Sequence, residues 1–385
     1  MAKGCYIGVD GKARKVKKGY VGIDGKARKI KKAYIGVGGV ARPCWSGGEL
    51  VYYGEITPLS TPRYRLAGAS NNNYALFAGG TPNPITSDDT NVVECYDSSL
   101  TKTDAPNLTS SVTYLAGARN ESYALFAGGQ YNGRTSRATV DAYDDSLTKS
   151  TPTNLTTATY NLAGANVGQY ALFAGGYLNP TNMTSTSDVN AYNNDLTKTT
   201  PTSLRIATDN LCGGNVGQYA LFAGGCRWNT SYGYEESPIY VTAYDVSLTR
   251  SDAPNLQGGR KELASANAGE YLLFAGGRDG NGYLSERKYV DVYDKNLTRT
   301  NGTALSLAKY RLVGASVGGY AVFPRLNSNT KDMTDVYDKD LTHTTIQNDV
   351  SSYHGEQSAG ASIGNYAIFA GGSKSSELVN VYTVS

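Results

Sequence analysis

The chain has 385 residues, of which 45 are Gly and 31 are Tyr, and its net charge is only +3. No apolar run approaches the roughly 18 residues of a membrane-spanning helix, and no apolar stretch typical of a secretory signal follows Met1. We therefore expect synthesis in a cytoplasm, without secretion or a membrane span. Short apolar stretches broken by Gly, Asn, Asp, Ser and Thr predict an all-β protein.

The N-terminal segment is strongly basic. Residues 1–42 hold twelve Lys or Arg against Asp10 and Asp24, a net charge of +10. Because the whole chain carries +3, residues 43–385 carry −7. This contrast predicts two units, a basic arm over residues 1–49 and a second domain over residues 50–385.

A 14-residue unit is repeated within the arm. The stretch YIGVDGKARKVKK at 6–18 returns as YVGIDGKARKIKK at 20–32, and a degraded third copy runs over 34–45. Asp-Gly between short β-type stretches predicts small hairpins. So little apolar surface is not expected to fold without a partner. The basic side chains expected to make that contact are Lys12, Arg14, Lys15, Lys17, Lys18, Lys26, Arg28, Lys29, Lys31 and Lys32.

Three kinds of arm are compatible with these repeats: one that docks on an acidic protein surface, one that binds nucleic acid through phosphate contacts, and a solvated tail. The near-identical copies argue against a tail, and we rank protein docking above nucleic acid. The repeats resemble those that begin tail-associated structural proteins of phages and prophages of Gram-positive gut bacteria. The resemblance implies a virion component, present in several copies, that residues 1–45 anchor to other virion proteins of a tail or baseplate.

A longer repeat occupies the rest of the chain. The phrase YALFAGG at 74–80 returns with small changes at intervals of 46–52 residues, and a Tyr-Asp-x-x-Leu-Thr phrase follows most copies. Each of the seven units is predicted to form four strands: a small apolar inner strand, an aromatic second strand ending at Gly-Gly, a third strand ending at Tyr-Asp, and a Thr-rich outer strand. This period and strand number are typical of propeller blades.

The two ends of the repeat predict how the ring closes. The seventh unit stops after its third strand, whereas the pair Leu59 and Leu66 repeats the spacing that elsewhere separates an outer strand from the next inner strand. Residues 51–59 are therefore predicted to be a displaced outer strand that pairs with residues 378–384. Closure would remove an exposed sheet edge.

The Gly-Gly pair after an aromatic strand, followed by Tyr-Asp, is similar to the Kelch repeat family over about residues 50–385. The chain departs from that family where Leu-Thr takes the place of the usual Trp after Tyr-Asp. The resemblance implies a seven-bladed Kelch-like β-propeller, a fold that often serves as a binding scaffold.

We find no catalytic constellation, and we predict no enzyme activity, cofactor or metal. The two histidines, His343 and His354, are expected on the surface or in loops, and the five cysteines as free thiols. Arginines recur near the connections between outer and inner strands and are interpreted as solvated loop charge. They are Arg63, Arg65, Arg205, Arg260 and Arg311.

The variable loops after Gly-Gly are predicted to share one face and to carry recognition. Their aromatic side chains suit contact with a host-surface glycan or protein. The candidates are Tyr131, Tyr177, Trp228, Tyr232, Tyr234 and Tyr283, with the fourth loop, residues 226–238, first among them. The sequence thus favours a virion structural protein of the tail, baseplate or fibre type. A carbohydrate-active propeller enzyme and a cellular Kelch adaptor are the alternatives.

Overall fold

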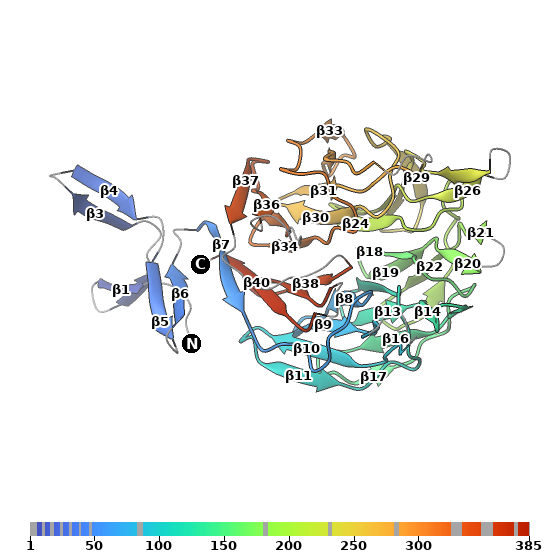
Figure 1. Ribbon diagram of the computed structural model, residues 1–385, viewed down its shortest axis with the longest axis horizontal. Coiled ribbons are helices and arrows are strands. Elements are labelled where there is room, and N and C mark those ends of the chain that lie inside the picture. The colour runs from blue at the N-terminus through green and yellow to red at the C-terminus, as the bar shows by residue number, and fades with distance from the viewer. Residues whose placement is uncertain are drawn as a thin grey trace.

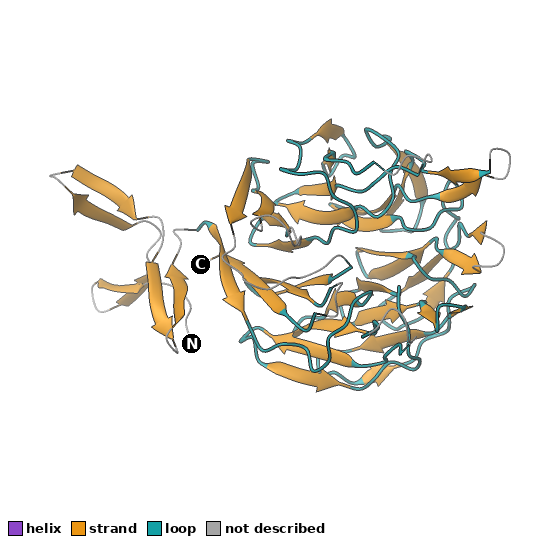
Figure 2. Ribbon diagram, in the orientation of Figure 1, coloured by secondary structure: helices purple, strands orange, loops and turns teal. Residues whose placement is uncertain are grey.

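The computed structural model describes residues 48–82, 88–179, 184–229, 233–280, 285–324, 333–347, 357–372 and 376–384, together with the backbone of six strands between residues 6 and 45. The elements in these ranges are strands joined by turns and loops (Figure 2). Seven four-stranded antiparallel sheets stand around one axis, and the predicted all-β, seven-bladed propeller is confirmed (Figure 1).

The blades follow one another in chain order, each from the inner to the outer strand. Blade 1 is β8 (Ala67–Ser70), β9 (Tyr74–Ala78), β10 (Val93–Asp97) and β11 (Lys102–Ala105). Blade 2 is β12 (Ala116–Arg119), β13 (Ala124–Ala127), β16 (Val140–Tyr143) and β17 (Lys149–Ser150). Blade 3 is β18 (Ala163–Val167), β19 (Tyr170–Ala174), β22 (Val189–Tyr192) and β23 (Lys198–Thr199).

Blade 4 is β24 (Cys212–Val216), β25 (Tyr219–Ala223), β28 (Val241–Asp245) and β29 (Arg250–Ala253). Blade 5 is β30 (Ala264–Ala268), β31 (Tyr271–Ala275), β32 (Val290–Tyr293) and β33 (Arg299–Asn301). Blade 6 is β34 (Ala315–Val317), β35 (Tyr320–Phe323), β36 (Met333–Tyr337) and β37 (His343–Gln347). Blade 7 is β38 (Ala359–Ile363), β39 (Tyr366–Ala370), β40 (Val379–Val384) and β7 (Leu50–Glu55).

Blade 7 is completed from the N-terminal side of the chain, as the leucine spacing predicts. Strand β7 pairs antiparallel with β40, with Leu50 opposite Val384 and Glu55 opposite Asn380, and the register shifts once between Val381 and Tyr382. The ring is therefore closed by hydrogen bonds between the first and last strands of the propeller.

In blades 1 to 6 the Tyr of the Tyr-Asp phrase, which reads Tyr-Asn in blade 3, holds the blade to the segment that enters it. Tyr192 is fully buried, packs edge-to-face on Phe173 with ring centroids 6.2 Å apart, and donates its hydroxyl to the carbonyl oxygen of Thr153 at 2.8 Å. The Asp of the phrase caps the turn, since Asp97 Oδ1 accepts the backbone N–H of Thr101 at 2.8 Å.

Glycines let the inner strands approach one another closely at the axis. A Cβ added to Gly164 would lie 2.1 Å from the carbonyl oxygen of Gly117 in the preceding blade. Blade 5 is the exception: Ser265 stands at the equivalent position and donates its hydroxyl to Gly213 at 2.6 Å. Blade 4 carries Gly214 where the earlier blades carry Ala. A Cβ there would lie 2.6 Å from Leu272 Cδ1 and 3.3 Å from the Ser265 Cβ, so the glycine leaves room chiefly for Leu272.

The arm forms three antiparallel hairpins, as the Asp-Gly repeats predict. They are β1 (Tyr6–Val9) with β2 (Lys12–Lys15), β3 (Gly19–Ile23) with β4 (Lys26–Ile30), and β5 (Ala33–Val37) with β6 (Val40–Trp45). None of these hairpins contributes a strand to a blade. The basic side chains named above as anchoring candidates lie outside the described residues.

Candidate functional site

Seven residues, one before each inner strand, surround the axis on one face of the propeller. We call them the axial ring: Arg65, Tyr114, Asn161, Asn210, Glu262, Arg311 and Gln357. All seven have left-handed backbone, with φ between 52° and 66°. Left-handed backbone is uncommon in residues other than Gly, so seven equivalent cases mark a constrained feature.

Backbone hydrogen bonds link the axial ring from blade to blade. Six N–H groups of the ring each donate to the carbonyl oxygen of the previous ring member at 2.9–3.1 Å, beginning with Arg65 to Gln357 and ending with Arg311 to Glu262. Because of the left-handed backbone, the N–H group of each of these residues points to one neighbour in the ring and the carbonyl group to the other. The backbone geometry is therefore the same in each blade and does not depend on which side chain is present.

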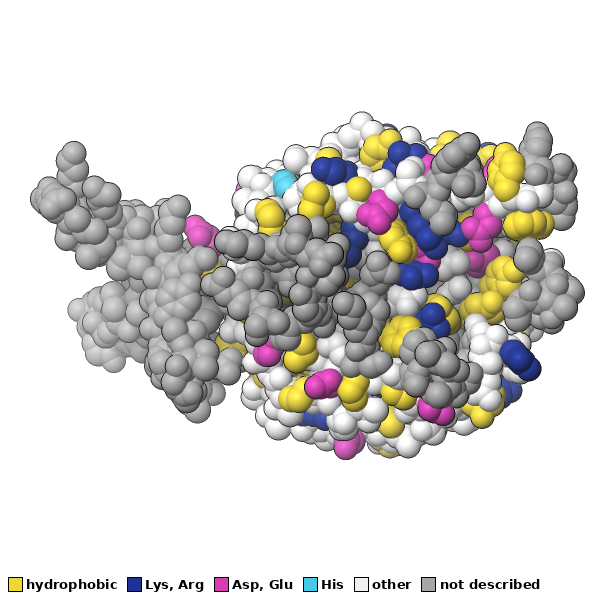
Figure 3. Space-filling view, in the orientation of Figure 1, with side chains coloured by type: hydrophobic (Ala, Val, Ile, Leu, Met, Phe, Trp, Pro, Cys, Tyr) yellow, Lys and Arg dark blue, Asp and Glu magenta, His cyan; other side chains and the backbone are white. Residues whose placement is uncertain are grey.

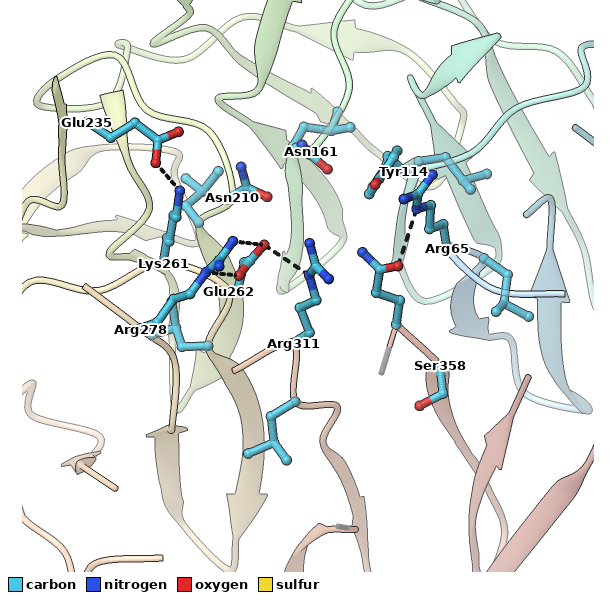
Figure 4. A pocket seen from close by; sticks show the side chains of 17 residues that line it. Arg65, Tyr114, Asn161, Asn210, Glu235, Lys261, Glu262, Arg278, Arg311 and Ser358 are labelled. Carbon is cyan, nitrogen blue, oxygen red and sulfur yellow. Dashed lines mark hydrogen bonds and ion pairs between the residues drawn. The ribbon is translucent and has the colours of Figure 1, made fainter. Parts of the chain in front are cut away.

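The side chains of the ring surround a cavity of about 410 Å³ (Figure 4). Its base is formed by leucines that begin the inner strands, and Glu235, Lys261, Arg278 and Ser358 complete the wall. We call this cavity the axial mouth. Its volume falls in the range of about 300–1,000 Å³ that is typical of small-molecule sites.

Ion pairs organise one side of the axial mouth. Glu262 Oε2 forms an ion pair with Arg278 Nε at 2.6 Å, and its Oε1 accepts hydrogen bonds from Arg278 Nη2 and Arg311 Nε, each at 3.2 Å. Lys261 Nζ pairs with Glu235, which reaches the mouth from the hairpin of blade 4. In Figure 3, basic and acidic side chains lie together near the middle of this face.

On the other side, Arg65 is held without an acidic partner in the described chain. Its Nε donates to Gln357 Oε1 at 3.2 Å, and its guanidinium lies over the rings of Tyr64 and Tyr114 at 4.8 and 4.5 Å. Aromatic faces stabilise such a cation without neutralising it. With Arg65, the mouth has four cations against two carboxylates, a net charge of +2.

A buried carboxyl group lies next to the mouth. Asp209 is 3 % exposed and accepts hydrogen bonds from the Ser185 hydroxyl at 2.5 Å, from Asn210 Nδ2 at 2.6 Å and from the Cys226 thiol at 3.3 Å. Burial raises the pKa of Asp209, and the hydrogen bonds oppose that rise only in part. Burial likewise raises the pKa of the Cys226 thiol.

Three extra hairpins form a row on the same face, over blades 2 to 4. They are β14 (Gln130–Tyr131) with β15 (Thr135–Ser136), β20 (Tyr177–Asn179) with β21 (Thr184–Ser185), and β26 (Arg227–Asn229) with β27 (Tyr234–Glu236). Neighbouring hairpins touch, since the Ser136 hydroxyl donates to the Leu178 carbonyl oxygen at 2.6 Å and β21 contacts β26. We call this row the crest.

The four predicted aromatic candidates that the structure describes lie on the crest but are not equivalent. Tyr131 and Trp228 are each 37 % exposed and Tyr234 is 42 % exposed, so these three are accessible. Tyr177 is only partly exposed and packs on Tyr160 with ring centroids 5.4 Å apart. The other two candidates, Tyr232 and Tyr283, fall outside the described residues.

The prediction that the recurring arginines are solvated loop charge is wrong for two of them. The Arg63 guanidinium pairs with Glu94 at 2.9 Å, and that of Arg260 pairs with Asp291 at 2.6 Å; all four side chains are fully buried. Arg205 alone matches the prediction as an exposed residue. Arg65 and Arg311 belong to the axial mouth.

His343 was also wrongly placed on the surface or in a loop. It lies on outer strand β37, stacks on Tyr337 with centroids 4.8 Å apart, and its Nε2 is 2.7 Å from Asp335 Oδ1. His354 lies outside the described residues. Three cysteines are described, Cys95, Cys212 and Cys226, and all are free thiols as expected. Nowhere in the described ranges do three or more His, Cys, Asp or Glu side chains gather closely enough to hold a metal ion.

Sequence reasoning missed the axial ring as a unit. The signal was nevertheless present in the repeat. Leu66, Leu115 and their equivalents recur in blades 1 to 6, while the residue before each of them changes, from Arg65 to Tyr114 to Asn161. A position that varies inside an otherwise repeated framework is free of the framework's packing constraints. Superposing the repeats on one another would have pointed to it.

Comparison with known proteins supports the fold alone. No family model matches the chain, and no curated protein matches it. Among solved structures, "Structure of YjhT" is similar with a TM-score of 0.58 and 11 % sequence identity, over 76 % of this chain and 99 % of that one. In the residues described, no helix is long and apolar enough to cross a membrane.

Proposed function

We propose that the chain is a non-enzymatic binding component of a phage particle, a tail or baseplate accessory or a fibre-like protein. The basic arm docks on other virion proteins, and the propeller presents the face with the crest and the axial mouth to a host-surface glycan or protein. A Kelch-like repeat supplies the rigid scaffold, and the virion is the place where the protein acts.

The observation that carries the proposal is the separation of the arm hairpins from the ring. All seven blades are complete with strands that begin at Leu50, so the three tandem hairpins over residues 6–45 have no part in closing the propeller. Repeated basic hairpins outside a complete domain suit attachment to an acidic protein surface. The resemblance of their sequence to phage tail-associated repeats points to the particle as the attachment site.

Deleting residues 1–45 tests the proposal because the deletion leaves β7 intact. We expect the truncated chain to fold, with an unchanged circular dichroism spectrum, and to be lost from purified particles. A matched control replaces the ten anchoring Lys and Arg by Gln and keeps the hairpin sequence otherwise. Normal incorporation of the truncated chain would overturn the anchoring role, and association with a cellular partner but no particle would support a cellular Kelch adaptor instead.

A carbohydrate-active enzyme is the second candidate, because the axial mouth does hold two carboxylates. Glycoside hydrolysis needs one carboxyl group as an acid and a second as a base or nucleophile. Here Glu262 is engaged by two arginines and Glu235 by Lys261. We therefore favour binding over turnover, and release of a product from a bound saccharide would reverse that choice.

A further inference from the structure

We propose that the axial mouth binds one sugar residue that carries an anionic group, a carboxylate or a phosphate, and that Arg65 is the residue that pairs with that group. The inference rests on the proposed function, since it names the ligand class of the binding face. It concerns the mouth and not the crest, so the arm and the exposed aromatics have no part in it.

The first step is the freedom of the ring positions. Other left-handed positions in the repeat hold one residue type in blade after blade: Gly at the Gly-Gly pair of most blades, and Leu in the Tyr-Asp turn of six. The axial ring alone holds two Arg, two Asn, a Tyr, a Glu and a Gln at the same φ. All of these side chains carry hydrogen-bonding groups and none is aliphatic. Their common feature is therefore the ability to contact a polar ligand.

The second step is charge. The net charge of +2 favours an anion, and the ion pairs show which cation is available for it. Arg278 and Arg311 share Glu262, and Lys261 faces Glu235. Arg65 makes no ion pair in the described chain: it contacts the neutral Gln357 and two aromatic rings, and it interacts with the Asp89 carboxylate only at longer range. Its terminal nitrogens make no hydrogen bond in the described chain. A guanidinium held by stacking and by its Nε presents a fixed donor edge to a carboxylate or phosphate.

The third step is the rest of the wall, which suits hydroxyl groups. Within the described ranges, the Asn161 amide and the Tyr114 hydroxyl make no side-chain hydrogen bond, and the Ser358 hydroxyl is buried without a partner. Amides and hydroxyls both donate and accept, as sugar hydroxyls do. The leucines at the base, such as Leu66 and Leu162, offer an apolar surface to the C–H face of a sugar ring.

The test measures binding of three matched disaccharides to the full chain by calorimetry. Their terminal sugars are glucose, glucuronic acid and glucose 6-phosphate. We expect at least one charged disaccharide to bind about ten-fold or more tightly than the neutral one, and added salt to reduce that difference. Whichever charged sugar binds more tightly identifies the anionic group.

Variants then assign the contact. Arg65→Gln is expected to remove the preference for the charged sugar, and Asn161→Asp, which adds a negative charge to the mouth with almost no change in size, to weaken it about ten-fold. Arg205→Gln is the matched control, since Arg205 is exposed, paired with Asp252 and outside the mouth, and should bind like the parent chain. Circular dichroism and thermal unfolding confirm that each variant is folded.

Three results would overturn the inference: equal binding of neutral and charged sugars, unchanged selectivity in both mouth variants, or Arg65-dependent binding of an acidic peptide with no binding of any sugar. The last result would leave the proposed function intact and replace the ligand class. Whether the chain without residues 1–45 is incorporated into particles does not depend on sugar binding. The virion proposal and the sugar-binding proposal can therefore fail separately.

Discussion

The close packing of the inner strands at the axis gives the sharpest prediction. Gly164→Ala places a Cβ 2.1 Å from the Gly117 carbonyl oxygen and 3.2 Å from the Ala118 Cβ. Since real Cβ atoms essentially never come closer than 3.0 Å to another heavy atom, two inner strands must move apart by nearly 1 Å. Gly164 has no left-handed φ, so the cost is steric and not conformational. Overpacking of this kind costs about 3 kcal/mol, the upper end of the usual range.

Urea unfolding followed by circular dichroism measures this cost as a shift in midpoint at constant slope. Ser265→Ala is the matched control, because blade 5 already accommodates a Cβ at this position. It should lose only the hydroxyl's hydrogen bond to Gly213, about 1 kcal/mol. Equal stability of Gly164→Ala and Ser265→Ala would refute the packing explanation.

Three further outcomes follow from buried polar groups. Tyr192→Phe removes a buried hydroxyl and should lower the free energy of unfolding in urea by about 1–2 kcal/mol. Tyr131→Phe on the exposed crest should change it by less than about 0.5 kcal/mol. Equal effects would contradict a stabilising hydrogen bond from Tyr192 to Thr153. Glu94→Gln leaves the fully buried Arg63 guanidinium without its acidic partner and should lower the free energy of unfolding by about 3 kcal/mol. Adding Arg63→Met to that variant should restore part of the lost stability. If it restores none, an uncompensated buried charge is not the cause of the loss. Because burial raises the folded-state pKa of Asp209 above its unfolded value, its contribution to stability is fully present below the unfolded pKa and is lost as pH rises through the folded pKa. Asp209→Asn should therefore gain stability relative to the parent chain as the pH rises above the unfolded-state pKa of Asp209. A stability difference that does not vary with pH would be inconsistent with a buried ionising carboxyl group.

The fold was predictable from the sequence because the sequence pattern of one blade is repeated seven times. The phrase at 74–80 fixes the second strand of each blade, and the Leu59–Leu66 spacing predicts ring closure without any knowledge of long-range contacts. Such periodic signals depend only on local sequence. They carry no information on which side chains from different blades meet.

That limit explains the errors at the site. Arg63 resembles a loop arginine until the structure shows Glu94, on a different strand, buried against it. In the same way, Glu235 and Lys261 come from different blades, and only the hairpin of blade 4 brings them together. The axial mouth is built from residues about 50 positions apart in the chain, so its charge emerges only when the ring closes.

Ring closure also sets the order in which the molecule is completed. Strand β7 is among the first parts of the propeller to leave the ribosome, yet β40, its sheet partner in the described residues, is the last strand of the propeller. Until residues 379–384 emerge, six blades and an unfinished seventh stand as an open arc with an unpaired edge at each end. Those two edges therefore need protection during synthesis, by the ribosome or by a chaperone. The closed ring has no such need, because β7 and β40 then pair with each other.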